Sequence, residues 1–405
     1  MRHDKLYILV ICLSAVTLLA WLGSRSSGIV KIPLPEIATG PAAEASLPPP
    51  SSTELPTELL PDVQGRVRFR DNPYTAHGRL TVEEIFDRIL IAGERLQADP
   101  DRAAAIVNEL MDLLESLGPP EATSQAIVDF LDSGLDMGTG LGLELNADGF
   151  LIASPTLRVA LIDMLGRVDP AAAADYAETI LASRTSPDEW AVALRNYARG
   201  APESLSQDYL RSKTTDLVTD GEWSRNPTTG YLQAFDLVVH TGSVDLVPEL
   251  ESYLRSRTDE QALAWASFLA TDRLASEKPI EVLSLLLEKP SLMAREPFVR
   301  AGLFARADVR EPAEREILEA YLLRDDLGTE EIAKLAAIFP LHSEFVGPRL
   351  VTRDPVLDIR DQAYETLAAL ETVEQWLLDP RFTQHTSALE GMRDRLAELV
   401  ASAKR

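Results

Sequence analysis

The chain has 405 residues, of which 45% are hydrophobic and only 6% aromatic, and its net charge is −25. An aliphatic core of this kind favours closely packed helices over aromatic-rich β layers. An acidic surface repels phosphate backbones, which excludes nucleic acid as an expected partner, suits a basic protein partner, and also serves solubility alone. The single cysteine, Cys12, excludes an intrachain disulfide and a cysteine-based metal site.

The N-terminal segment predicts a membrane anchor. Residues 6–22 (LYILVICLSAVTLLAWL) carry no charge, and Trp21 stands where an interfacial aromatic residue would. We expect residues 1–23 to be an uncleaved signal anchor, because the best small-residue cleavage site contains Arg25. The short N-terminal tail favours a bacterial inner-membrane protein with its C-terminal part in the periplasm. The alternative is a cleaved, secreted periplasmic protein.

Residues 24–80 read as a linker. Prolines recur through them, three in succession at Pro48, Pro49 and Pro50, with Ser, Ala and Glu between. Such a composition breaks regular elements and gives an extended, largely disordered spacer.

Residues 81–405 read as one helical domain. Thr81 and Glu84 form a capping box before an apolar stripe, and Asp99-Pro100 opens a further helix. Helix-opening prolines then recur at nearly even spacing in two runs, first at Pro155, Pro170, Pro187 and Pro202, and further on at Pro279, Pro297 and Pro312. Two helices therefore recur about every 32 residues, which predicts an all-α fold, an α-solenoid of stacked helical hairpins.

Three segments carry an arginine in the first turn of such a helix. They are Ser154-Pro-Thr-Leu-Arg158, Glu296-Pro-Phe-Val-Arg300 and Asp354-Pro-Val-Leu-Asp-Ile-Arg360, of which the last matches best. The pattern resembles the second helix of a HEAT-like repeat of the short bacterial type. The resemblance implies that Arg158, Arg300 and Arg360 bond acidic and backbone groups of the neighbouring repeat. Independently, a cation at a helix start opposes the helix dipole and indicates an acidic partner.

No motif points to catalysis, a metal or a cofactor. The five histidines are scattered without ligand spacing. Gly138-Thr-Gly-Leu-Gly142 lacks the strand and the lysine of a phosphate loop. Glu144-Leu-Asn-Ala-Asp-Gly149 resembles the start of a calcium loop, but Pro155 replaces the closing glutamate. We therefore expect no catalytic residue, no metal site and no cofactor.

Two long segments interrupt the helical period, and both are predicted to be loops: 134–153 and 212–230. Long loops in a compact stack are functional or disordered. Trp223 stands in the second among polar residues, which makes it a candidate partner-binding residue. The alternative is that Trp223 packs back over its own helical hairpin.

The sequence as a whole predicts a membrane-anchored envelope scaffold or adaptor that binds a protein partner through an acidic solenoid surface. This expectation rests on architecture alone. The alternatives are an envelope enzyme acting on cell-wall glycan, which would need a pair of carboxylates in a cleft, and a purely structural periplasmic spacer.

Overall fold

The structure is a computed structural model that describes residues 114, 120–201, 203–255, 261–343, 345, 347, 349–353 and 358–403. All of these lie in one compact unit, Asp71–Arg405. The expected anchor (1–23), the linker (24–80) and the two helices predicted near Thr81 and Pro100 lie outside the described residues, Leu114 excepted. No helix among the described residues is long and apolar enough to cross a membrane.

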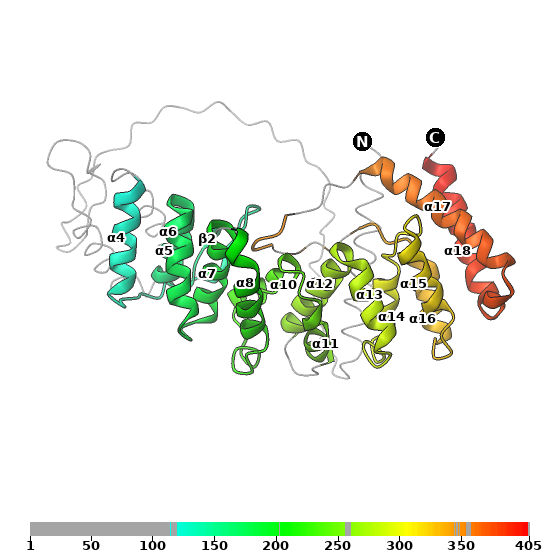
Figure 1. Ribbon diagram of the computed structural model, residues 1–405, viewed down its shortest axis with the longest axis horizontal. Helices are drawn as coiled ribbons and strands as arrows, with labels where there is room; N and C mark the ends of the chain where they lie inside the picture. The colour runs from blue at the N-terminus through cyan, green and yellow to red at the C-terminus, as the bar shows by residue number, and fades with distance from the viewer. Residues whose placement is uncertain are drawn as a thin grey trace, which may run out of the picture. The chain divides into compact units, whose positions relative to one another are not determined.

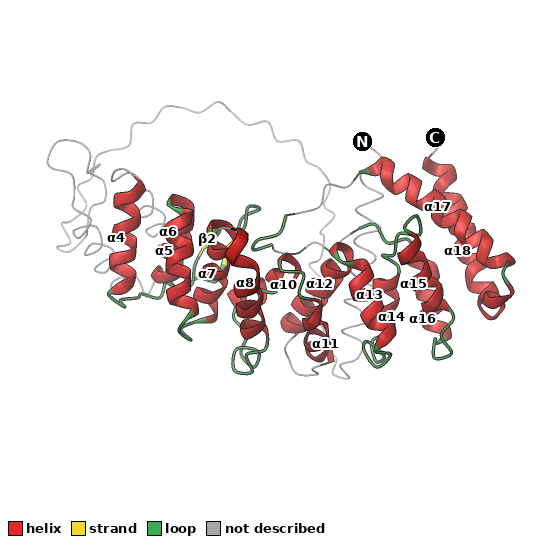
Figure 2. Ribbon diagram, viewed as in Figure 1, coloured by secondary structure: helices red, strands yellow, loops and turns green. Residues whose placement is uncertain are grey.

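The described part is mostly helical, as the sequence predicts (Figure 2). The α-helices of its first half are α4 (Pro120–Asp132), α5 (Leu157–Val168), α6 (Pro170–Leu181), α7 (Pro187–Gly200), α8 (Glu203–Val218), α9 (Thr229–Gln233), α10 (Asp236–His240) and α11 (Val247–Arg255). Those of its second half are α12 (Gln261–Glu277), α13 (Pro279–Glu288), α14 (Pro297–Phe304), α15 (Pro312–Leu322), α16 (Thr329–Ile338), α17 (Ile359–Leu378) and α18 (Thr386–Ala403). Two 3-10 turns, η1 (Val244–Leu246) and η2 (Pro380–His385), precede α11 and α18.

Local capping determines where most helices begin. Helices α6, α7, α13, α14 and α15 each start at the proline predicted to open them. The side chain of Asp169 accepts the Ala172 amide and caps α6, and Ser186 caps α7 in the same way. At Pro155 the prediction is wrong, because α5 begins two residues later, with Thr156 as its cap. The backbone of Thr156 is paired with Gly138 instead of entering the helix.

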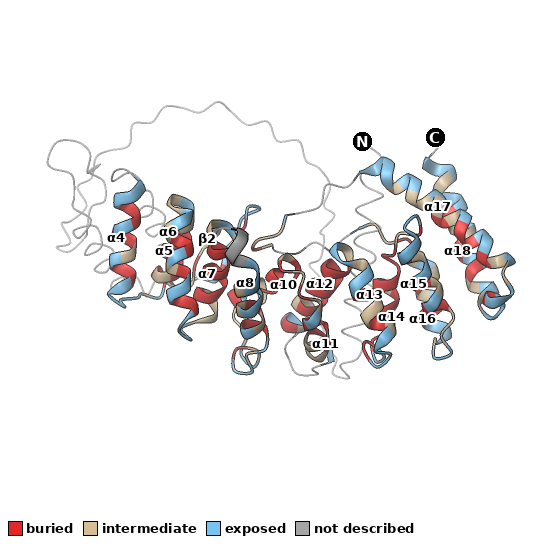
Figure 3. Ribbon diagram, viewed as in Figure 1, coloured by how far each residue is buried: buried red, intermediate tan, exposed pale blue. Residues whose placement is uncertain are grey.

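The contacts between helices group those after α4 into two layers, and Figure 1 shows the helices following one another in chain order. One layer holds α5, α7, α9, α10, α12, α14, α16 and α18, in which most helices contact the next member. The other holds α6, α8, α11, α13, α15 and α17, each packed on the first layer or on its own neighbours. Figure 3 shows buried residues on the helix faces turned toward each other. The core consists of these aliphatic faces, as the composition predicts.

The predicted loop 134–153 contains a small antiparallel hairpin. Strands β1 (Glu144–Leu145) and β2 (Leu151–Ala153) pair with one register irregularity. The side chain of Asn146 accepts the amides of Asp148 and Phe150, so it shapes the turn between the strands. The residues that resemble a calcium loop therefore form a hydrogen-bonded hairpin turn.

The predicted loop 212–230 is shorter than expected, because α8 continues to Val218. Its polar threonines suggest a loop, but Thr215 and Thr219 each donate their hydroxyl to the carbonyl four residues earlier, within or at the end of the helix. This back-bonding satisfies a threonine hydroxyl inside a helix. Leu217 and Val218 are buried, so tertiary packing supplies the stabilisation that local propensity does not.

Gly149 in the hairpin turn provides a test of this packing. Its φ is +76°, and a Cβ there would meet the carbonyl oxygen of Leu350 and lie 2.8 Å from Nη2 of Arg199. Gly149→Ala should lower the free energy of unfolding by about 1–3 kcal/mol, through backbone strain and the clash. The measurement is chemical denaturation of the purified protein. Gly391→Ala in exposed α18, where nothing lies within 4 Å, is the control and should be neutral or stabilising. Equal destabilisation by both substitutions would contradict the packing described here.

Candidate functional site

Two of the three repeat arginines join alternate helices at their N-terminal ends. Arg158 in the first turn of α5 donates Nε to Glu189 of α7 at 3.1 Å, and donates Nη1 to the carbonyl of Leu131 in α4 at 2.6 Å. Arg300 in α14 donates Nε and Nη2 to Glu331 of α16 at 2.6 and 2.8 Å. Both pairs span 31 residues, so the same contact recurs at the same sequence separation.

The electrostatics of these pairs follow from burial and helix position. The side chains of Arg300 and Glu331 are only 3% and 2% exposed. The hydrogen bond and the charge of Glu331 raise the pKa of Arg300 against the opposing effect of burial. For Tyr321, burial and the charge of Glu331 both raise the pKa of the hydroxyl. It therefore stays protonated and donates to Glu331 at 2.6 Å. Glu189 and Glu331 lie in the first turns of their helices, where the helix dipole stabilises a carboxylate.

Arg360 is placed differently, although its segment matches the HEAT-like pattern best. Its side chain is exposed, and it has no acidic partner among the described residues. Its backbone amide donates to the carboxylate of Asp358, which caps α17. The acidic partner expected for Arg360 is therefore not found in this part of the chain.

A second set of buried ion pairs, not anticipated from the sequence, joins the same layer further along its helices. Arg195 of α7 contacts Asp163 of α5 at 2.5 Å, and Arg306 after α14 contacts Asp272 of α12 at 2.6 Å. Burial lowers the pKa of Arg195, while the charge of Asp163 opposes that shift. The first pair links α7 to α5, and the second links the turn after α14 to α12.

A third pair extends this set: Arg273 of α12 lies 3.6 Å from Asp236 of α10. In the sequence, these ion pairs are indicated by charged residues that stand within the apolar stripes of helices. Asp163 interrupts LIDML, Arg195 interrupts ALRNY, and Asp272-Arg273 interrupts LATDRLA. A charged residue buried in a stripe requires a partner, so such positions predict contacts between helices.

These buried charges also hold the chain segments that lie on the helices. The β1–β2 hairpin is fixed by Arg195, which donates to the carbonyl of Gly149 at 2.9 Å, and by Asp163, which accepts the amide of Leu151 at 3.0 Å. The ring of Phe150 lies under the guanidinium groups of Arg195 and Arg199, 4.9 and 4.6 Å from its centroid.

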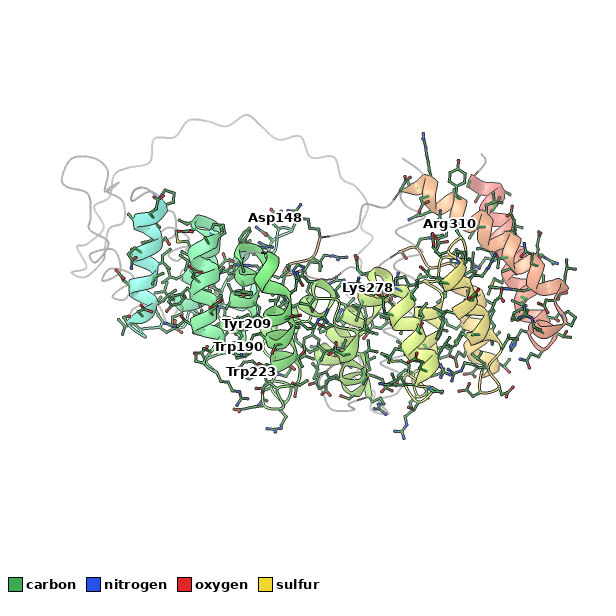
Figure 4. All side chains as sticks on the ribbon, in the orientation of Figure 1. Asp148, Trp190, Tyr209, Trp223, Lys278 and Arg310 are labelled. Atoms are coloured by element: carbon green, nitrogen blue, oxygen red, sulfur yellow. The ribbon has the colours of Figure 1, made fainter. Side chains whose placement is uncertain are left out.

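Trp223, the candidate partner-binding residue, is 9% exposed. Its ring meets that of Trp190 edge to face, with centroids 5.2 Å apart, and the Arg184 guanidinium lies 5.4 Å from its centroid. Figure 4 labels Trp190 of α7, Tyr209 of α8 and Trp223 in the loop after α8 in the same region of the picture. This placement fits the packing alternative, and a role of Trp223 in partner binding stays a prediction.

The described residues contain no group of three or more His, Cys, Asp or Glu side chains arranged to hold a metal ion. In the same part of the chain, the segment around His240 is a helix end. Helix α10 ends at His240, Gly242 has a φ of +60°, and Ser243 precedes the turn η1.

The described part of the chain thus defines an all-α protein with a small β-hairpin, whose alternate helices are joined by buried arginine–carboxylate pairs. Comparisons with protein-family models, with curated proteins and with solved structures found no match.

The repeat arginines can be tested as a matched series. Arg300→Ala leaves Glu331 buried without its cation and should lower the free energy of unfolding by about 3–5 kcal/mol. Arg158→Ala should cost about 1–3 kcal/mol, because its pair with Glu189 is more exposed, with side chains 13% and 8% accessible. Arg360→Ala is the control and should change little, since its side chain is exposed. Urea titrations of the three variants measure this order, and a large loss in Arg360→Ala would contradict it.

Trp223 can be tested by separating packing from binding. Trp223→Ala should lower the free energy of unfolding by about 3–5 kcal/mol, because the buried ring contact with Trp190 is lost. Trp223→Phe keeps a ring at that place and should recover most of the loss. Thermal melting followed by tryptophan fluorescence measures both effects. A stable Trp223→Ala variant that has lost a protein partner would instead assign the residue to binding.

Proposed function

We propose that the helical hairpins form an α-solenoid of HEAT-like repeats, and that the protein is a membrane-anchored scaffold or adaptor of the bacterial cell envelope. The observation that carries the repeat assignment is the recurring pair Arg158–Glu189 and Arg300–Glu331. Each pair joins alternate helices of one layer across 31 residues. Such a recurrence is expected where each structural repeat contacts only its neighbours.

The adaptor role is supported by a segment of extended chain that charged side chains of the helices already bind. Backbone groups of a distant segment, residues 341–353, are held by charged side chains of α7, α10, α12 and the turn after α14. A surface that binds extended chain through main-chain atoms suits a protein partner. The net charge of −25 favours a partner with basic character.

The envelope location is supported by residues 6–22, which carry no charge. An uncharged run of this length is near the lower limit for a membrane-spanning helix. The proposal places the helical domain in the periplasm, at the end of the Pro-rich spacer of residues 24–80, where it can reach partners away from the membrane surface.

The test uses the full chain in a bacterial host with a photoreactive amino acid at exposed Glu281 of α13 or Glu316 of α15. Both positions should crosslink the same protein, and the yield should fall at high salt because the attraction is electrostatic. The chain should also remain in the membrane pellet after alkaline carbonate washing. A control chain, with residues 2–23 replaced by a cleavable secretory signal, should be released.

Three outcomes would count against parts of the proposal. A soluble mature form of the natural chain beginning near Ser27 would contradict the anchor and favour secretion. Unrelated crosslinked proteins at the two positions would contradict a shared partner. Cleavage of cell-wall glycan by the purified chain would favour the enzyme alternative.

A further inference from the structure

One stretch of chain between α16 and α17 contacts helices that lie far earlier in the sequence. We call it the cis segment, residues 341–353; Glu344, Val346 and Pro348 in it are not described. Its described residues form neither helix nor strand. Its Val351 bonds Asp236, 115 residues earlier. In Figure 1 part of the segment lies above α10, beside β2.

Four charged side chains, three on α7, α10 and α12 and one in the turn after α14, hold this segment by its main chain. We call these the main-chain-binding face: Arg199, Asp236, Arg273 and Arg306.

Each member of the face bonds a different stretch of the backbone. Arg306 donates to the carbonyls of Leu341 at 3.5 Å and Ser343 at 3.1 Å. Arg273 donates to Gly347 at 3.0 Å, and Arg199 to Leu350 at 3.1 Å. Asp236 accepts the amides of Val351 and Thr352 at 2.7 and 2.8 Å. Because every peptide has these groups, the same contacts are open to an extended chain of another sequence.

Side chains of the cis segment set its register on the face. The ring of Phe345 lies 5.0 Å from Phe268 and 6.2 Å from Trp265, both on α12. Leu350 is fully buried, and the hydroxyl of Thr352 donates to Asp236 at 2.5 Å.

Gly347 marks the point of closest approach to α12. A Cβ there would lie 2.6 Å from Cδ1 of Leu269 and 3.1 Å from Nη2 of Arg273. The segment therefore presents the pattern Phe-x-Gly-x-x-Leu-x-Thr to a surface that accommodates it.

Arg306, Arg273 and Asp236 of the face have ion pairs that do not involve the segment. Arg306 makes two bonds to Asp272, at 2.8 and 2.6 Å, and Arg273 lies beside Asp236. If the cis segment left, these charges would still have partners within the helices. These three side chains would then stay arranged for another extended chain, which lowers the cost of binding one.

We propose that the main-chain-binding face is a peptide-binding site, that the cis segment is its resident occupant, and that an extended peptide of a partner protein with the pattern Phe-x-Gly-x-x-Leu-x-Thr displaces it. The clause that the peptide comes from a partner rests on the proposed adaptor function. The site itself does not, because its contacts lie within this chain.

The first test uses the full chain and a fluorescent synthetic peptide with the sequence of residues 341–353. The variant Phe345→Ala with Leu350→Ala weakens the resident occupant and leaves the face unchanged. It should bind the peptide at least ten-fold more tightly than the natural chain does. A peptide carrying Gly347→Leu should bind at least ten-fold more weakly, because its side chain meets Leu269 and Arg273. A scrambled peptide sets the background, and circular dichroism checks that the variant is folded.

A second measurement covers the case in which that variant does not fold. Hydrogen exchange of the natural chain should show the amides of Val351 and Thr352 opening at least ten-fold more often than the α12 amides, and the free peptide should accelerate their exchange. Exchange at the rate of global unfolding would overturn the proposal, since the segment would then be a fixed part of the fold. So would a folded variant that binds the peptide no better than the scrambled control.

The two proposals fail separately. Peptide binding without a crosslinked envelope partner would leave the face in place and contradict the adaptor function. A crosslinked partner without peptide binding would support the adaptor function and contradict the peptide-binding site. The partner would then be expected on the exposed faces of α13 and α15.

Discussion

The arrangement of the helices depends on the requirement that buried charges have partners. Taking an arginine and a carboxylate out of water costs several kcal/mol per ion, and close geometry with further hydrogen bonds must offset that cost. Arg195–Asp163, Arg300–Glu331 and Arg306–Asp272 meet this requirement, with side chains no more than 3% exposed. A shift of one helix along its neighbour would separate such a pair and leave two charges buried alone.

This constraint supplies something that the aliphatic core does not. Contacts among Ala, Leu and Val are non-directional, so many offsets between two helices bury comparable area. The arginine pairs add direction, because a planar guanidinium matches a carboxylate in few orientations. We infer that hydrophobic burial provides most of the stabilisation between the layers, whereas the ion pairs select which helices meet and in which register.

The sequence predicts the features that depend on neighbouring residues. Asp169-Pro170 and Ser186-Pro187 start helices as expected, because a cap acts within a few residues. Contacts between residues about 30 positions apart cannot be predicted in this way. Glu189 lies in the first turn of α7, yet its carboxylate pairs with Arg158, 31 residues earlier. Arg360 has the best local pattern, yet its side chain is exposed and has no acidic partner in the described part of the chain. The residues close to an arginine in sequence do not indicate whether the adjacent helix places a carboxylate beside it.

The cis segment shows why the candidate site was hidden from sequence reasoning. It has no period, so nothing in it indicates that it lies on α10, more than a hundred residues earlier. Its position follows from the charges that already fix the helices: Asp236 and Arg273 pair with each other and also bond its backbone. The same side chains thus join α10 to α12 and bond the main chain of the cis segment. Any change in the register of these helices would move the donors apart, so the binding geometry of the face is a consequence of the fold.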